Sequence, residues 1–437
     1  MNSPVDARSL TRAQSFFATI QIAVLFFIFG FVTWINALLI PYFKIACELT
    51  NFQSYLVTFA FYISYFIFSV PSSYLLKRHG FKKGMMVGFW IMSLGAFIFI
   101  PAALIRNYFV FLTGLFSLGI GLAILQTAAN PYITILGPKE RAAQRLSVMG
   151  IFNKAAGIIA PVILAAVILR ATDDTLVKDL PFMLDVVREQ KLDEFIRRVI
   201  TPYSVVGVIL VILGVAIRYS TLPEIETENE DDAMVIANSG KQRITQFPYV
   251  VLGAIAIFLH VGSQVIAVDS VIGYATSMQI PLSEAKIFPS YTLAAQICGY
   301  ILGIILIPTA ISQANALRAC TVLGVLLTVL IIVSEKQVNF LGHQTDISIW
   351  FVVLLGFANS MLWAGIWPLA LDGLGRFTKV GASLLIMGLC GNAIVPLFYG
   401  YLADVSDLRH AYWVLLPCYL YLVFYSFHGH KIKSWSR

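Results

Sequence analysis

The side chains that could do chemistry in this sequence are amides and indoles placed inside long apolar segments. Gln126 and Asn130 lie four residues apart in the segment GIGLAILQTAANPYITILGP, at residues 119–138. In a helix this spacing puts both side chains on one face, one above the other. Amides both donate and accept hydrogen bonds, so such a face can bind hydroxyl groups. The same amides can also join neighbouring helices, and that alternative stays open.

Similar residues recur in other apolar segments. Trp363 and Trp367 repeat the four-residue spacing, and Trp367-Pro368 corresponds to Asn130-Pro131. Indole faces suit the apolar face of a sugar ring, although the two tryptophans could also form an interfacial belt. The residues that we predict to bind a substrate are Asn36, Gln126, Asn130, Asn153, Gln264, Gln296, Asn359, Trp363, Trp367 and Asn392. This set is rich in amides and poor in charge, as a neutral polyol requires.

Three ionisable residues also fall inside apolar segments. Asp269 is the strongest signal, because a carboxylate within a membrane is functional by default. We predict that Asp269 and His260 couple transport to an ion, either Na⁺ or H⁺. Three alternatives stay open: Asp269 lies beyond an early helix end, His260 only packs helices, and Lys154 extends its ammonium to the membrane surface. Asp372 and Asp404 fall at predicted helix ends and are expected to act as caps or gates.

The sequence favours no enzyme. It shows no nucleophile–base pair and no metal-ligand spacing inside the apolar segments, so we expect neither catalysis nor a cofactor. The five cysteines are scattered without a CxxC pair, which is typical of small apolar filling residues.

The composition requires a membrane. The chain has 437 residues, of which 59% are hydrophobic and only 12% charged, and its mean hydropathy is +0.82. A soluble domain carries about 25% charged residues. Apolar runs of about 20 residues, each long enough to cross a bilayer as a helix, recur along the chain. The formal charge of +7 lies mainly in short loops, so it indicates contact with lipid and not with nucleic acid.

The fold class is therefore an all-α polytopic membrane protein of about twelve transmembrane helices. The predicted spans are residues 16–39, 52–76, 85–105, 109–136, 146–169, 202–220, 248–274, 287–311, 317–334, 347–371, 380–403 and 412–428. We expect Pro41 to close the first span, and an amphipathic surface helix over residues 180–200. Residues 14–221 form an N-terminal six-helix bundle, 222–246 an acidic linker, and 247–430 a C-terminal six-helix bundle.

The two halves look like repeats of each other. Met149-Gly150 and Met387-Gly388 occupy corresponding spans, as do the two X-Pro steps described above. Equal span counts then predict two bundles related by a pseudo-twofold axis along the membrane normal. The lysine and arginine clusters fall in loops on one side, so both termini and the linker should be cytoplasmic and residues 171–201 outside.

Three stretches of the chain resemble a known family. They are residues 33–66, the segment LQTAANPYITILGP at 125–138, and GFANSMLWAGIWPLALDGLG at 356–375. These are similar to the fucose–galactose–glucose:cation symporter branch of the major facilitator superfamily, and the likeness covers nearly the whole chain. The resemblance implies a monomeric sugar transporter of the bacterial inner membrane that works by alternating access.

The chain departs from that family at positions used for coupling. Proton-coupled fucose permeases carry carboxylates where this chain has Ala37 and Gln126, and many relatives have Glu where it has Gln264. Asp269 is then the most plausible remaining coupling residue. The turn at residues 77–84 resembles the superfamily's motif between spans 2 and 3 but lacks its usual Asp. We expect its basic residues to act in gating; they are Lys77, Arg78, Lys82 and Lys83.

The sequence thus predicts a secondary transporter that takes up a neutral hexose of the glucose/galactose, fucose or N-acetylglucosamine class by symport with a cation. The alternatives are an uncoupled sugar facilitator and a transporter-like sugar sensor, the latter disfavoured by a short linker without an output domain. Neither the sugar nor the ion follows from the residues.

Overall fold

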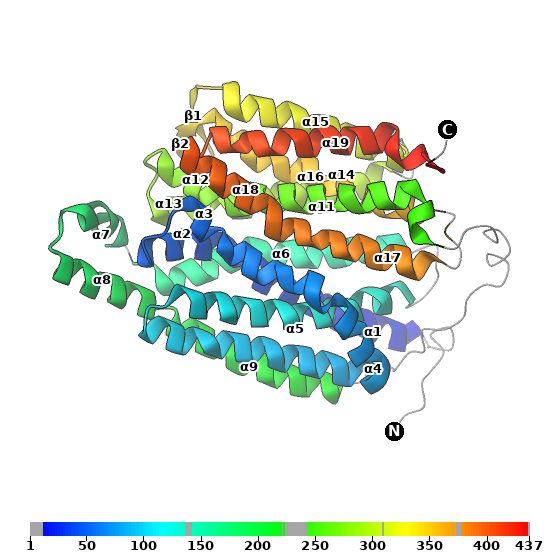
Figure 1. Ribbon diagram of the computed structural model, residues 1–437, viewed down its shortest axis with the longest axis horizontal. Helices are drawn as coiled ribbons and strands as arrows, with labels where there is room; N and C mark the ends of the chain where they lie inside the picture. Colours follow the sequence, from blue (N-terminus) through cyan, green and yellow to red (C-terminus); the bar gives the residue numbers. More distant parts are fainter. Residues whose placement is uncertain are drawn as a thin grey trace.

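The computed structural model describes residues 12–135, 142–170, 172–220, 222, 243–307, 310–372, 374 and 377–435. Long helices run side by side through the molecule, and Figure 1 shows them lying nearly parallel to its longest axis. Within the described part of the chain the strands form one antiparallel hairpin, which pairs Gln337 with Asp346 and Phe340 with His343.

The N-terminal half is helical throughout its described residues. Its elements are α1 (Arg12–Trp34), α2 (Asn36–Ala46), α3 (Asn51–Ser54), α4 (Leu56–Leu104), α5 (Tyr108–Ile135), α6 (Ala142–Ile168), α7 (Asp173–Asp179), η3 (Leu180–Phe182), α8 (Asp185–Arg197) and α9 (Ile200–Arg218). α4 bends at Gly80, whose φ of 78° suits glycine, and this bend separates two spans at the predicted basic turn.

The C-terminal half repeats this pattern and adds the hairpin. Its elements are η4 (Ile244–Gln246), α11 (Pro248–Asp269), α12 (Val271–Ser277), α13 (Leu282–Ala285), α14 (Phe288–Leu306), α15 (Gln313–Val333), β1 (Gln337–Phe340), β2 (His343–Asp346), α16 (Ile347–Leu371), α17 (Thr378–Met387), η6 (Gly388–Cys390), α18 (Gly391–Val405), η7 (His410–Val414), α19 (Leu415–Phe427) and η8 (Gly429–Lys431).

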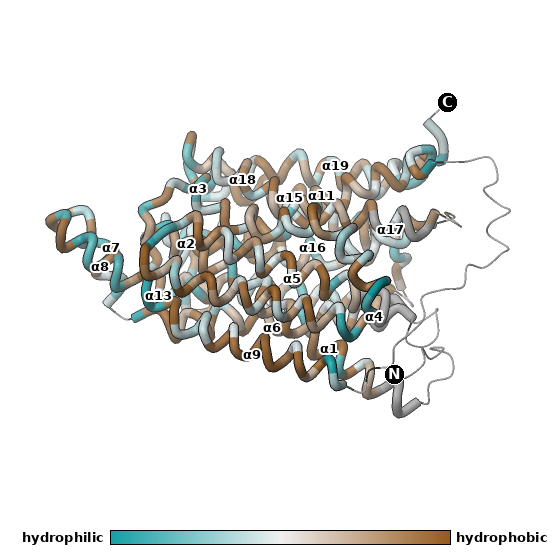
Figure 2. The backbone as a smooth tube through the Cα atoms, turned by 60° about the horizontal axis from the view of Figure 1, so that its bottom comes forward, coloured by the Kyte–Doolittle hydropathy of each residue, from teal (hydrophilic) through white to brown (hydrophobic). Residues whose placement is uncertain are grey.

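The helices suit a bilayer. In the described residues 11 helical segments are long and apolar enough to cross a membrane, and Leu56–Ser69 is a shorter apolar helix. Figure 2 shows apolar residues along the length of α9, whose Val208 and Ile212 side chains are exposed. The prediction of a polytopic helical protein with about twelve spans is confirmed.

Equivalent helices pack in equivalent ways in the two halves. In the N-terminal half α1 packs on α6 and α4 on both α5 and α9; in the C-terminal half α11 packs on α18 and α15 on both α16 and α19. The halves meet through α6 against α14 and through α4 against α18. Predicted residues 223–242 of the linker lie outside the described residues, so the exact domain limits stay predictions.

The bundle has two opposite ends, the hairpin end and the linker end. The hairpin end carries β1, β2, α7 and α8, at the left of Figure 1. The linker end, at the right, carries η4 and the start of α17.

The structure corrects three local predictions. Pro41 does not end the first span, because the helix breaks at Ile35 and α2 continues through Pro41 to Ala46. The surface helix is α8, which begins at Asp185 after a short 3₁₀ turn. The hairpin was not predicted; its Leu341-Gly342 turn has positive φ at both residues, as a type I′ turn requires.

Candidate functional site

Several buried polar side chains have atoms without a hydrogen-bond partner in the described part of the chain. They are Asn36, His260, Asp269, Gln296, Asn359 and Asn392. An unpaired buried polar group costs about 1–3 kcal/mol, so folded proteins keep few of them. Such a concentration is expected where a polar ligand supplies the missing partners.

One face of α16 presents an amide and two indoles. Asn359, Trp363 and Trp367 follow one another at four-residue spacing. The two rings stack with centroids 5.1 Å apart and an interplanar angle of 24°. Asn359 is fully buried; its Nδ2 donates to the Leu355 carbonyl oxygen at 2.9 Å, whereas its Oδ1 has no partner. The stack shows that Trp363 and Trp367 share one face of α16, as their four-residue spacing implies, and their role in binding stays a prediction.

On the corresponding face of α5, some polar side chains contact other groups of the N-terminal half. The Gln126 side chain lies beside the Tyr65 hydroxyl group of α4, within the same half. Thr127 Oγ1 donates to the Ala123 carbonyl oxygen at 2.7 Å. The Asn130 side chain lies outside the described residues, so its predicted role is not placed. Gln126 therefore joins two helices, and its contact with a ligand remains a prediction.

Asn153 has partners inside its own half. Its Oδ1 accepts from Trp34 Nε1 at 3.2 Å, and its Nδ2 donates to the Phe26 carbonyl oxygen at 3.3 Å. The neighbouring Lys154 places its Nζ 4.0 Å from the centroid of the Trp34 ring. Sequence reasoning missed Trp34; the available signal was a tryptophan inside a long apolar segment, two positions before Asn36.

Lys154 and His260 come from different halves and lie close to each other. His260, on α11, is 1% exposed and interacts electrostatically with Lys154 of α6. Its ring also lies beside the Asn359 amide. A cation, an imidazole, an amide and an indole thus converge at one place between the bundles.

Asp269 is buried at the last position of α11. Its side chain is inaccessible in practice, with 1% exposure of the residue, and neither carboxylate oxygen has a partner among the described residues. The alternative of an exposed Asp269 is therefore wrong. Its charge acts on Tyr55 and Tyr62 of the other half. Asp269 thus faces the contact between the halves without being neutralised there.

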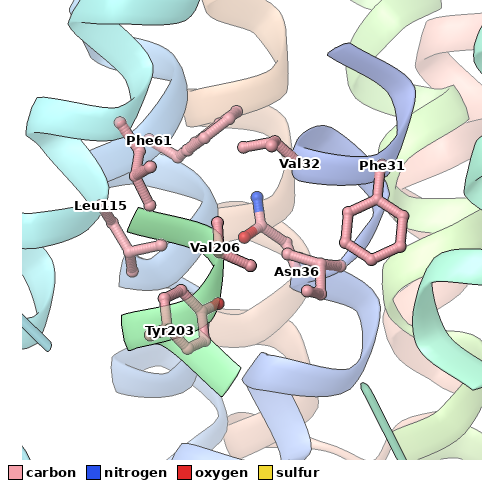
Figure 3. A pocket seen from close by; sticks show the side chains of 9 residues that line it. Phe31, Val32, Asn36, Phe61, Leu115, Tyr203 and Val206 are labelled. Carbon is pink, nitrogen blue, oxygen red and sulfur yellow. The ribbon is translucent and has the colours of Figure 1, made fainter. Parts of the chain in front are cut away.

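The remaining predicted binding residues are spread over several helices. Gln296 on α14 is fully buried beside Tyr300, Asn392 on α18 is 8% exposed, and Gln264 on α11 is half-buried. Asn36 takes a different position. It faces a small apolar pocket inside the N-terminal half, together with Phe61 of α4 and Tyr203 of α9 (Figure 3).

A hydrogen-bonded contact between Asp404 and residues 51–52 joins the two halves at the hairpin end, and we call it the Asp404 latch. The Asp404 carboxylate, at the end of α18, accepts from the backbone N–H groups of Asn51 at 2.8 Å and Phe52 at 2.7 Å. A side chain at Gly400 would collide with Tyr55 and with the backbone of Phe52, so close approach requires glycine there. Asp404 lies at a helix end, as predicted, and contacts the other half; its role as a gate stays a prediction.

The basic turn at the linker end is anchored within its own half. Lys82 Nζ donates to the Ser220 carbonyl oxygen, at the end of α9, at 2.8 Å. Arg78 is exposed and Lys83 half-buried, and the Lys77 side chain lies outside the described residues. The gating role of these four residues remains a prediction.

Known proteins share this architecture. The family model described as Major Facilitator Superfamily matches residues 22–384. The chain is 33% identical to the glucose/galactose transporter of Brucella abortus biovar 1 (strain 9-941), with 98% of each chain covered. It is 30% identical to the L-fucose-proton symporter of Escherichia coli (strain K12), over 87% of this chain and 86% of the symporter.

A solved structure agrees with these sequence relatives. A Major Facilitator Superfamily transporter in the outward conformation superposes with a TM-score of 0.68 at 26% identity, over 94% of this chain and 98% of that one. These relatives are transporters, and the matches span nearly the whole chain. The chain belongs to the Major Facilitator Superfamily of membrane transporters.

Proposed function

We propose that this protein takes up a neutral hexose across the membrane by alternating access between its two halves. The observation that carries the proposal is the buried Asn359, whose Oδ1 has no partner in the described part of the chain, on the same face of α16 as the stacked Trp363 and Trp367 and beside the contact between the bundles. Relatives named as glucose/galactose transporter and L-fucose-proton symporter favour a hexose as the substrate.

The chemistry of these groups fits a neutral sugar. Amide groups exchange hydrogen bonds with hydroxyls in both directions. The flat indole face offers apolar contact to the C–H side of a pyranose ring. A buried polar group without a partner costs about 1–3 kcal/mol. Each sugar hydroxyl that pairs with such a group removes this cost, and the difference contributes to the free energy of sugar binding.

The proposed orientation places the linker end in the cytoplasm and the hairpin end outside, in a bacterial inner membrane. It rests on the basic residues near the linker end, which follow the positive-inside rule. With this orientation the Asp404 latch closes the outer side of the protein. Alternating access then requires that Asp404 release Asn51 and Phe52 when the outer side opens.

We further propose that uptake is coupled to a cation and that Asp269 is the coupling residue. Its carboxylate is buried without a partner and faces Tyr55 and Tyr62 of the opposite half. A buried carboxylate is strongly disfavoured unless a proton or a cation neutralises it. Binding of that ion and of the sugar would be linked reciprocally. His260, which lies beside Lys154 instead, is the second candidate.

The test of substrate class uses purified protein in liposomes. Uptake of labelled glucose, galactose, fucose, mannose and N-acetylglucosamine is measured for the parent, Asn359→Ala and Asn339→Ala. Asn339 lies in the exposed strand β1 and serves as the matched control. Asn359→Ala should weaken apparent affinity for the best sugar about 5- to 150-fold. No uptake of any hexose by a folded parent contradicts the proposed function.

The test of coupling imposes a Na⁺ gradient or a pH gradient on the same vesicles. The parent should accumulate sugar above equilibrium with one of the two ions, and Asp269→Asn should still equilibrate sugar but lose accumulation. Accumulation by Asp269→Asn would show that another residue couples. If the parent only equilibrates sugar under both gradients, the chain is a facilitator, which the missing carboxylates at Ala37 and Gln126 would explain.

A further inference from the structure

Lys154 is a buried cation without an anionic partner. The residue is 7% exposed and lies near the middle of α6. In the described part of the chain no carboxylate lies within ion-pair distance of its Nζ, which lies 4.0 Å from the centroid of the Trp34 ring. A cation–π contact offsets only part of the cost of burying an ammonium.

The ammonium cannot reach water at the membrane surface. The apolar part of α6 begins at Val148, six positions before Lys154, which is about 9 Å along the helix axis. The side chain does not extend toward that end, because the residue is 7% exposed and its Nζ lies over the Trp34 ring. The alternative of a snorkelling Lys154 is therefore wrong, and the amino group belongs to the interior of the protein.

The groups around Lys154 form two walls that come from different halves. On the N-terminal side, Trp34 donates a hydrogen bond to Asn153. His260 and Asn359 lie on the C-terminal side, with His260 Nδ1 and Asn359 Oδ1 unpaired. The ammonium has three hydrogen-bond donors and no acceptor, so any ligand that binds it must bring acceptor atoms.

We propose that Lys154 contacts the transported sugar and that its positive charge excludes cationic amino sugars from the site. The proposal rests on the proposed function, because it assigns a selectivity to the same hexose site. Sugar hydroxyl oxygens accept hydrogen bonds from the ammonium. A 2-amino-2-deoxyhexose is protonated at neutral pH, and its ammonium is repelled inside a medium of low dielectric constant.

The comparison of glucosamine with 2-deoxyglucose isolates the charge. Both lack the hydroxyl at carbon 2, and only glucosamine is cationic. Each is tested as an unlabelled inhibitor of labelled hexose uptake in liposomes at neutral pH. The parent should bind glucosamine about 10- to 100-fold more weakly than 2-deoxyglucose. Equal inhibition by the two sugars in the parent overturns the proposal without any mutation.

Variants then assign the selectivity to Lys154. Lys154→Gln should weaken hexose affinity about tenfold and bring the two inhibition constants within about threefold of each other. Lys154→Arg should keep the exclusion of glucosamine. Lys336→Gln, which removes a lysine charge from an exposed position at the hairpin end, should change neither quantity.

The outcomes separate this proposal from the proposed function. If the parent transports no hexose, the proposed function fails. If hexose transport is present and Lys154→Gln excludes glucosamine as strongly as the parent does, only the selectivity assigned to Lys154 fails. If Lys154→Gln does not fold, the comparison between the parent and Lys154→Arg decides, and loss of exclusion in Lys154→Arg would contradict an effect of charge.

Discussion

Removal of the Asp404 carboxylate should open the hairpin end. Asp404 accepts two backbone hydrogen bonds from the other half, from Asn51 and Phe52. A hydrogen bond to a charged group contributes about 1.5–3 kcal/mol when buried, but Asp404 is exposed. We therefore assign about 1.5–2 kcal/mol to the pair of bonds after solvent screening. Asp404→Ala should lower the ratio of closed to open molecules about 10- to 30-fold.

Spin labels placed on the two halves measure this ratio. Phe109, at the hairpin end of α5, is 75% exposed, and Leu341, in the hairpin turn, is 60% exposed. Cysteines at these positions, in a protein whose exposed Cys298 is replaced by serine, take the labels. Electron–electron distance distributions in nanodiscs should gain a longer component in Asp404→Ala.

Asp407 supplies the matched control for this experiment. It lies three residues from Asp404, but its carboxylate accepts from Arg409 N and His410 N of its own half. Partial burial acts to raise the pKa of Asp407, but the hydrogen bonds from His410 and Arg409 outweigh it and hold that pKa below its usual range. Asp407→Asn therefore removes one negative charge, as Asp404→Ala does, without cutting a contact between the halves. Identical distance distributions in both variants and the parent would refute the latch.

Three further predictions concern the site and its packing. Trp363→Phe should weaken sugar affinity a few-fold and Trp363→Ala about tenfold or more, because phenylalanine keeps a flat apolar face; equal losses in uptake kinetics would mean that the indole N–H is what matters. Tyr65→Phe should reproduce most of the effect of Gln126→Ala on uptake if Gln126 only joins helices, whereas a much larger effect of Gln126→Ala assigns that amide to the sugar. Gly356→Ala should lower the free energy of unfolding of the purified protein by about 1–3 kcal/mol, because the added Cβ would collide with the Thr292 carbonyl oxygen, whereas Gly273→Ala, with open space around it, should be neutral in the same thermal unfolding assay.

The long apolar runs of the sequence predict most of the helices of the fold. The span over residues 347–371 coincides with α16, because an uninterrupted apolar run has one stable form in lipid. The breaks were harder to foresee. Ile35 and Ser270 interrupt helices at positions without glycine or proline, so packing against neighbours sets them. The hairpin escaped notice because only Gly342 marks its turn.

The site was predictable in kind and less so in detail. The four-residue spacing puts Trp363 and Trp367 on one face of α16, because that relation depends on local geometry alone, but their stacking on each other was not predicted. The partners of Gln126 and Asn153 come from other helices, Tyr65 on α4 and Trp34 on α1, and a single sequence does not encode which helices meet. The same reason hid the proximity of Lys154 to His260, which joins residues from opposite halves.

A structure of the protein with its best transported hexose tests the central claim most directly. The proposed function predicts the sugar between the two halves, with its ring against Trp363 or Trp367 and hydroxyl groups within hydrogen-bond distance of Asn359 Oδ1. A sugar bound instead in the apolar pocket beside Asn36, inside the N-terminal half (Figure 3), would contradict it.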